Sequence, residues 1–203
     1  MTQQLMSISH QPFSYQYLKD VFREYSYPRN KISKLLSSGE LISLKSGLYA
    51  LSESYGKELV PEVVANLLYG PSYVSLDYAL SFYGMIPERV FCITSVTTGR
   101  KKLFDTSYGS FSYQQLKPAY YCLAYIHHRM NDTSYLIASA EKALCDKLYL
   151  ASMLDNSNNL QQYLFDDLRI DERSLEQLDK KAISKLADAS GKRNLKLLKR
   201  MIA

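Results

Sequence analysis

The side chains best suited to recognising another molecule lie in residues 28–38. When this segment is placed on a helix with 100° between residues, its isoleucine and leucines share one face, and Asn30 and Lys34 fall on the opposite face. An asparagine can form two hydrogen bonds with adenine, and a lysine can reach guanine or a phosphate. The segment therefore predicts a DNA-reading helix. The predicted contact residues are Arg29, Asn30, Lys31, Ser33, Lys34 and, from the turn that follows, Lys45.

The elements around this segment have the order expected for such a reader. Residues 14–25 have the apolar spacing of a helix, with Ser14 as a plausible N-cap. Residues 41–51 read as two short strands joined by a turn at Lys45, where a wing lysine would meet the adjacent phosphates. Helix, turn, helix and hairpin together predict a winged helix-turn-helix.

The charge of this region agrees with a phosphate-facing surface but does not require one. Residues 25–50 hold four basic side chains and one acidic side chain. The same pattern also fits an ordinary solvated surface helix. A winged helix can also serve protein contact alone, because one fold is reused for several functions.

Residues with catalytic chemistry do not assemble into a site. His127 and His128 are adjacent, so on a strand they point to opposite faces and cannot chelate one ion. Three carboxylates could be imagined as a site; they are Asp105, Glu141 and Asp146. Glu141 and Asp146 are five residues apart on a predicted helix, which does not place them squarely on one face. No phosphate-binding glycine loop or nucleophile motif is present. We expect no enzyme, no metal and no cofactor, with a nuclease-like enzyme kept as the alternative.

Two further basic segments have two readings each. The loop 98–102 follows a predicted buried strand, and residues 192–200 hold five basic residues and no acidic one. The simpler interpretation is that the charges of both segments are solvated on the surface. In residues 192–200 the cations would also be favoured by the negative partial charge at the C-terminal end of a helix. The second segment remains open as a further surface for a nucleic-acid backbone.

The rest of the chain predicts a larger α/β unit. Helices are expected at residues 61–69, 76–85 and 139–153, a buried strand at 90–97, and strand candidates between 101 and 137, including 120–128 and 134–138. The last 40 residues read as helices with a break at residues 190–191. The predicted fold class is α/β (α+β), with a winged helix-turn-helix in residues 1–55, a mixed α/β domain in residues 56–203, and the boundary near 52–58.

Composition sets the compartment that we expect. The chain has 203 residues, a formal net charge of +5, three cysteines and 18 tyrosines; composition does not explain the tyrosine number. The cysteines have no metal-site spacing and stand in apolar surroundings, which predicts buried thiols in a reducing compartment. The first 13 residues lack the features of a signal peptide, and no apolar stretch reaches the length of a membrane span. We expect a cytoplasmic protein.

Several motifs resemble the AbiEi family of antitoxin-regulators from type IV toxin–antitoxin systems, over about residues 14–150. In the first region the matching steps are Gly39-Glu40-Leu41 after the second helix and Gly47-Leu48-Tyr49 in the wing. Residues 70–102 resemble the family segment in which a serine-led helix precedes a threonine-rich strand. Its matching residues are Ser75, Ala79, Leu80, Gly84, Pro87, Thr94, Thr97 and Thr98. A third match is Ala140-Glu141-Lys142-Ala143 followed by Asp146.

The resemblance implies a transcriptional autorepressor that binds inverted repeats of double-stranded DNA in its own promoter. It also implies an abortive-infection antitoxin whose larger domain antagonises a co-encoded nucleotidyltransferase-like toxin, without a stable complex being assumed. Inverted repeats require two reading heads, so a dimer, or two monomers on the paired repeats, is expected on DNA.

Overall fold

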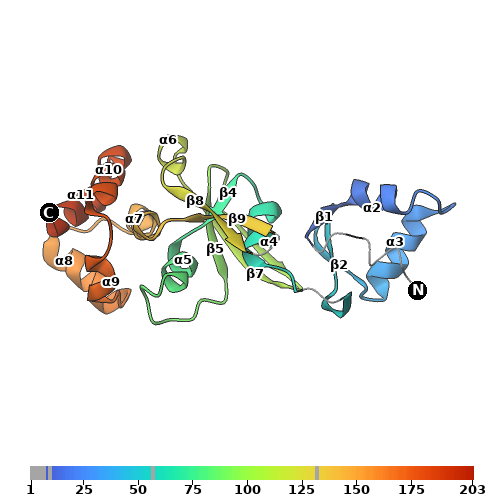
Figure 1. Cartoon of the computed structure of the whole chain (residues 1–203). Coiled ribbons are helices and arrows are strands. Elements are labelled where there is room, and N and C mark those ends of the chain that lie inside the picture. Colours follow the sequence, from blue (N-terminus) through green and yellow to red (C-terminus); the bar gives the residue numbers. More distant parts are fainter. Residues whose placement is uncertain (1–7, 9–10, 56–57, 131–132) are drawn as a thin grey trace.

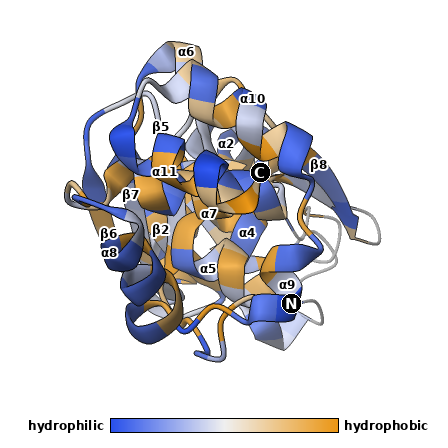
Figure 2. Ribbon diagram, turned by 90° about the vertical axis from the view of Figure 1, so that its left-hand side faces the viewer, coloured by the Kyte–Doolittle hydropathy of each residue, from blue (hydrophilic) through white to orange (hydrophobic). Residues whose placement is uncertain are grey.

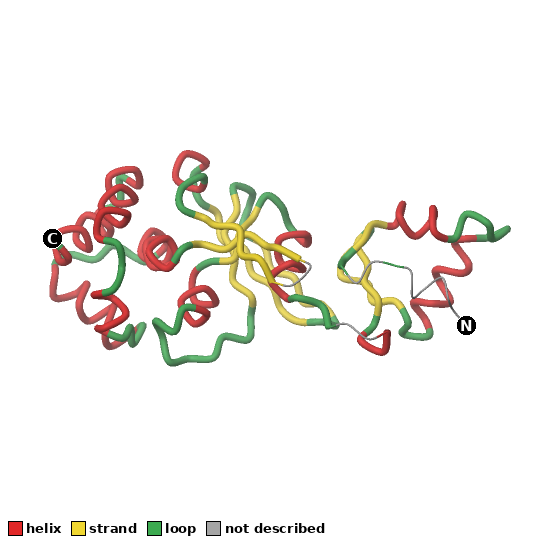
Figure 3. The backbone as a smooth tube through the Cα atoms, viewed as in Figure 1, coloured by secondary structure: helices red, strands yellow, loops and turns green. Residues whose placement is uncertain are grey.

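The computed structural model describes residues 8, 11–55, 58–130 and 133–203, and these form a mixed α/β structure (Figures 1 and 3). Figure 1 shows the N-terminal elements on one side, a sheet in the middle and the C-terminal helices on the other side. Most of residues 1–13, where no signal peptide is expected, and residues 56–57 of the predicted boundary lie outside the described residues. Among the described residues, no helix has the length and apolar character needed to cross a membrane.

The N-terminal elements follow the predicted order of helix, helix and hairpin, with one short strand added before them. That strand pairs with the second strand of the hairpin, so the three strands form a sheet in the order β1-β3-β2. The elements are β1 (Phe13–Ser14), α2 (Tyr15–Val21), α3 (Pro28–Ser37), β2 (Leu41–Lys45), β3 (Leu48–Leu51) and the 3-10 turn η1 (Glu53–Tyr55).

Local chemistry sets the ends of the two helices. The hydroxyl of Ser14 accepts the backbone N–H of Tyr17 at 3.1 Å, which confirms it as the N-cap of α2. The prediction that α2 continues to residue 25 is wrong, because the chain turns after Val21 and the N–H of Tyr25 bonds the carbonyl of Phe22. After α3, Gly39 has a φ of 73°, a left-handed conformation that glycine adopts without strain.

The hairpin β2–β3 separates two apolar cores. Leu41 and Leu51 are paired across the hairpin and pack with α2 and α3 in the smaller core. Leu44 and Ala50 belong to the larger core. The two cores therefore lie against opposite sides of this short sheet, while Ser43, Ser46 and Gly47 are exposed.

The larger core surrounds a six-stranded mixed sheet. Its order is β6-β7-β5-β4-β9-β8, in which β4 pairs in parallel with β9, β5 pairs in parallel with β7, and the other neighbours are antiparallel. The strands are β4 (Ser72–Val74), β5 (Ile93–Thr97), β6 (Lys102–Thr106), β7 (Gly109–Gln115), β8 (Tyr125–Met130) and β9 (Thr133–Ala138).

Helices cover both faces of this sheet. In Figure 1, α4 lies on the side of the N-terminal elements, and α5 and α7 lie on the other side, next to the C-terminal helices. The predicted break at residues 190–191 is confirmed, since Gly191 is left-handed between α10 and α11. The helices are α4 (Pro61–Leu68), α5 (Leu76–Phe82), α6 (Pro118–Tyr121), α7 (Ala140–Leu150), α8 (Ser157–Gln162), the π-helical η2 (Tyr163–Asp167), α9 (Glu172–Glu176), α10 (Lys180–Ser190) and α11 (Arg193–Ile202).

Two local predictions for this part of the chain are wrong. Residues 120–128 do not form one strand, because α6 occupies residues 118–121, where Pro118 suits the first turn of a helix. The cysteines are not all buried: Cys145 is buried, Cys92 is half-buried and Cys122 is exposed. Cys122 follows α6 on the surface, so its apolar neighbours in sequence do not enclose it.

The structure accounts for part of the unusual tyrosine content. Several buried or half-buried tyrosines pack their rings on the larger core and donate their hydroxyl groups to backbone carbonyls. Tyr113 donates to the carbonyl of Ala65 at 2.6 Å, and Tyr83 donates to that of Ala138 at 2.8 Å. A tyrosine can therefore bury a ring and satisfy a carbonyl at the same time.

Candidate functional site

The exposed face of α3 carries most of the residues predicted to contact DNA. Ile32 and Leu35 are buried against the small core, as the helical spacing predicts. On the other side, Arg29, Asn30, Ser33 and Lys34 are exposed. Among the described residues, the side chains of these four make no hydrogen bond or ion pair, so their donors and acceptors are available to a ligand.

The start of α3 is also open. Pro28 is its first residue and has no N–H, and no side chain caps the helix. The N–H groups of Asn30 and Lys31 bond the carbonyl of Tyr27, which leaves the N–H of Arg29 and the positive partial charge of the helix start to meet a phosphate. Tyr27 precedes the helix with 73% of its surface exposed. Tyr27 is not among the residues predicted to contact DNA, although its place directly before the predicted helix is a signal for such a role.

Lys31 is placed less openly than its neighbours. It is half-buried, and its ammonium lies 5.8 Å from the centre of the Tyr25 ring. Its charge still lies beside the exposed face of α3. Cation–π contacts of this kind are weak at exposed sites, so this one does not hold the ammonium away from a phosphate.

Lys45 is placed differently from the prediction of a wing lysine. Its ammonium donates to the carbonyl of Leu68 at 2.6 Å, and Leu68 is the last residue of α4. A cation at a helix C-terminus is favourable because the last carbonyls carry partial negative charge. In this arrangement Lys45 joins the hairpin to the larger core, and a contact with DNA would have to use the ammonium donors that this bond leaves free.

The contact of Lys45 predicts that its loss affects stability and not DNA binding. We expect Lys45→Met to lower the free energy of unfolding by about 1 kcal/mol in urea titrations, because a charged helix-end bond is removed. Lys34→Met is the control, since Lys34 is exposed and should leave stability unchanged. A Lys45→Met protein with normal stability and weakened DNA binding would return Lys45 to the DNA surface.

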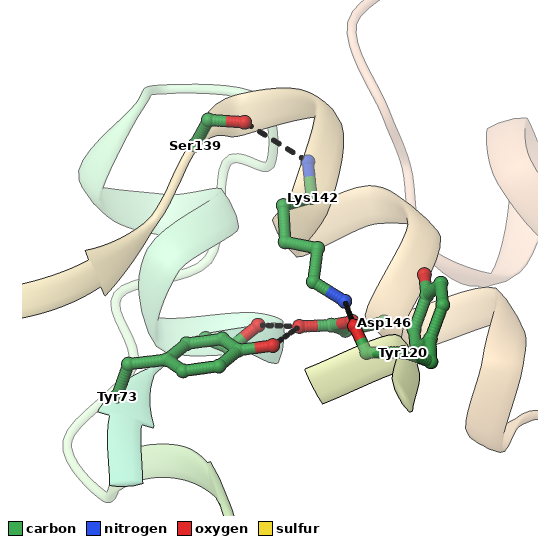
Figure 4. A network of polar contacts seen from close by, with 6 residues as sticks. Tyr73, Tyr120, Ser139, Lys142 and Asp146 are labelled. Carbon is green, nitrogen blue, oxygen red and sulfur yellow. Dashed lines mark hydrogen bonds and ion pairs between the residues drawn. The ribbon is translucent and has the colours of Figure 1, made fainter. Parts of the chain in front are cut away.

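A second cluster of polar residues lies at the centre of the larger core (Figure 4). One carboxylate oxygen of Asp146 accepts the Tyr73 hydroxyl at 3.1 Å and the Ser75 hydroxyl at 2.8 Å. Its other oxygen is 2.8 Å from the ammonium of Lys142, one turn earlier on α7. The ammonium also donates to the carbonyl of Tyr120 at 3.1 Å and lies 3.4 Å from the centre of that ring.

The charged groups of this cluster pair with each other and are closed to solvent, whereas the buried hydroxyl of Tyr120 has no hydrogen-bond partner among the described residues. The side chains of Lys142 and Asp146 have no exposed surface. Burial raises the pKa of the Asp146 carboxyl and lowers the pKa of the Lys142 ammonium, while the bonds from Lys142, Ser75 and Tyr73 oppose the first shift. A charge pair without an opening to solvent has no place for a substrate, so its arrangement is that of a structural centre.

The motif residues of the middle block have internal partners as well. Ser75 stands directly before α5, but its hydroxyl is used by Asp146 and makes no cap bond. Thr94 replaces it: its hydroxyl accepts the N–H of Tyr78 at 3.0 Å and donates to the carbonyl of Ser75 at 2.6 Å. Thr97 similarly donates to the carbonyl of Pro71 at 2.7 Å.

The remaining catalytic candidates stay apart. Asp105 accepts the hydroxyl of Ser110, and Glu141 accepts the hydroxyl of Ser139 and the N–H of Asp179. His127 and His128 lie on β8, which is an edge strand, and only His128 packs against aromatic rings. Within the described residues, no three histidine, cysteine or acidic side chains are grouped so that they could hold a metal ion.

No protein-family model and no curated protein matches this chain.

Proposed function

We propose that this chain is a DNA-binding transcriptional autorepressor whose N-terminal elements act as a winged helix-turn-helix, with α3 in the major groove. The observation that carries the proposal is the exposed face of α3, where Asn30 and Lys34 stand opposite the buried Ile32 and Leu35. Asn30 would read adenine, and Lys34 would reach guanine or a phosphate.

The neighbouring groups support the same orientation. The uncapped start of α3, Arg29 and Ser33 would contact the phosphates that flank the groove, with Lys31 beside them. The hairpin would serve as the wing through its turn at Ser46 and Gly47, because Lys45 is held by the carbonyl of Leu68. The DNA would be the protein's own promoter with inverted repeats, bound by a dimer or by two copies.

The resemblance to AbiEi proteins extends the proposal to an antitoxin role. The larger core, with its closed centre around Asp146, would be a rigid non-enzymatic unit that antagonises a nucleotidyltransferase-like toxin in the cytoplasm. Co-expression with a toxin gene adjacent to this one tests that part. Restored growth supports an antitoxin, and undiminished toxicity with normal expression contradicts it.

A gel-shift titration tests the DNA-binding part. We expect Asn30→Ala/Lys34→Ala to weaken binding to the upstream DNA by about 10- to 100-fold, because the variant has neither the amide that pairs with a base nor the cation beside it. Binding to scrambled DNA should weaken much less. The matched control is Gln161→Ala/Lys117→Ala, which removes one amide and one ammonium from exposed positions outside α3.

Two results would contradict this proposal. Wild-type protein with no preference over scrambled DNA at low salt would leave α3 as a surface for protein contact. Equal losses of affinity in the two double variants would mean that general charge, and not readout by α3, governs binding.

A further inference from the structure

A basic pocket opens between α11 and the segment that leads into α8. Its volume is about 440 Å³. Figure 2 looks toward this end of the molecule and shows hydrophilic residues of α8 and α11 facing the viewer. The residues that line the pocket are Asp155, Asn156, Ser157, Arg193, Lys196, Leu197 and Arg200.

Three cations of one helix face enter this lining. Arg193, Lys196 and Arg200 are spaced by three and four residues, so they share one side of α11, whereas Leu195 and Leu198 are buried on the other. Asp155 is the one acidic residue in the lining, which leaves a formal net charge of +2. The pocket is therefore a site for an anion.

The positive charge of the pocket is not neutralised within the described residues. Lys196 and Arg200 are exposed and make no hydrogen bond or ion pair there. Arg193 donates one N–H to the carbonyl of Asp155 at 2.5 Å. A carbonyl does not cancel the charge, and a guanidinium has five N–H donors, so Arg193 keeps donors for a ligand.

The other two cations near this helix are used differently. Lys199 is 2.7 Å from the carboxylate of Asp188 on α10. Lys192 lies 4.6 Å from the centre of the Tyr149 ring. The unpaired charge of α11 is thus concentrated on the side that faces the pocket.

The two walls of the pocket are fixed to each other by a buried asparagine. The amide of Asn194 donates to the carbonyls of Leu148 and Ser152 at 3.0 and 2.9 Å, and its oxygen accepts the N–H of Leu154 at 2.9 Å. These bonds hold α11 against the segment that runs into residues 155–157. The spacing of the lining is therefore set by the fold before any ligand binds.

From these observations we infer that the pocket binds a ligand with more than one phosphate, either a nucleic-acid strand or a compact polyphosphate such as that of a nucleotide. Guanidinium groups match phosphate oxygens with paired hydrogen bonds. Seven residues separate Arg193 from Arg200, which is about 10 Å along a helix and is longer than one phosphate group. No aromatic side chain lines the pocket, so it would contact phosphates and not stack on bases.

The test measures binding of two probes to the full chain at low salt. One probe is a fluorescent single-stranded oligonucleotide of about 15 nucleotides, followed by anisotropy, and the other is inorganic tripolyphosphate, followed by calorimetry. The pocket variant is Lys196→Glu/Arg200→Glu. The control is Lys181→Glu/Lys185→Glu, which reverses the same charge on α10, outside the lining.

We expect the pocket variant to bind at least one probe about tenfold or more weakly, and the control to stay within about threefold of wild type. For the oligonucleotide, the dependence of log affinity on log salt should flatten by about 0.7 for each phosphate that the variant no longer neutralises. Weakening confined to the oligonucleotide identifies a strand as the ligand, and weakening of tripolyphosphate binding identifies a compact polyphosphate.

Equal weakening in the two variants, or a wild-type protein that binds neither probe, would overturn the inference. Thermal melting of both variants shows whether they fold. The result is separable from DNA reading by α3, because Lys196→Glu/Arg200→Glu leaves the face of α3 unchanged and should keep the preference for the upstream DNA over scrambled DNA.

Discussion

The Lys142→Met variant is expected to lose about 3–5 kcal/mol of unfolding free energy, because it leaves Asp146 as a buried charge without its partner. Neither side chain has exposed surface, so water cannot replace the missing ammonium. The carbonyl of Tyr120 loses a donor in the same step. Urea denaturation at neutral pH measures the loss. The urea concentration at the unfolding midpoint should fall, while the slope of unfolding free energy against urea concentration should change little.

A second substitution separates loss of charge balance from loss of packing. Lys142→Met/Asp146→Asn removes both charges, and the asparagine oxygen can still accept from Tyr73 and Ser75. We expect it to recover about 2 kcal/mol relative to Lys142→Met, since no unpaired charge remains. Recovery near zero would show that the packing of the lysine chain, and not the pair, is what stabilises the core.

The pair between Lys147 and Asp77 is the control for burial. It has a similar distance, 2.7 Å, but its side chains are 24% and 34% exposed. Lys147→Met should cost no more than about 1 kcal/mol, because water can solvate the remaining carboxylate. An equal cost at both sites would mean that burial does not set the cost of losing the lysine.

The face of α3 could be predicted from the sequence because helical period decides it locally. Ile32 and Leu35 recur at helical spacing, and whatever they pack against, Asn30 and Lys34 must lie on the other side. The ends of the helices were also predictable where a local residue sets them, as Ser14 and Gly39 do. The end of α2 could not be predicted, because the helical spacing of apolar residues continues to residue 25 whereas the helix ends at Val21.

Contacts distant in sequence were not predictable in this way. Lys45 meets a carbonyl 23 residues away, and the hydroxyl of Ser75 meets a carboxylate 71 residues away. The residues that neighbour Lys45 and Ser75 in the sequence do not indicate which distant group each of them contacts. The spacing of Lys142 and Asp146 was a usable signal for an ion pair, but only the packing of α7 on the sheet shows that the pair is buried.

The C-terminal pocket shows the same limit. Five basic residues between 192 and 200 were visible as a run of charge. Which of these cations are paired is seen only in the folded protein, where Lys199 forms an ion pair with Asp188. The fold also shows that Asn194 holds the opposing wall of the pocket in place. The sequence therefore indicated a basic helix, and the structure adds which of its residues remain available.

The second large effect that we expect is unfolding at alkaline pH. Burial raises the pKa of Tyr121 to about 12 and that of Tyr135 to about 12, and it raises the pKa values of Tyr73 and Tyr113 further. An unfolded tyrosine ionises near pH 10, so between about pH 10 and 12 the unfolded chain releases protons that the folded chain retains. The contribution of these groups to stability is complete below about pH 10 and falls as the pH rises through this window.

The size of this effect can be checked with one variant. At about pH 11 each tyrosine whose pKa rises from 10 to 12 contributes about 1.4 kcal/mol of destabilisation, and several act together. We expect wild-type stability to be nearly constant up to about pH 9 and to fall steeply from there to about pH 11, and tyrosinate absorbance to rise cooperatively with unfolding. Tyr121→Phe should lose about 1.4 kcal/mol less over the same interval, since one such group is removed. Gradual tyrosine ionisation while the fold persists would contradict this prediction, because it would mean that the buried rings ionise without unfolding.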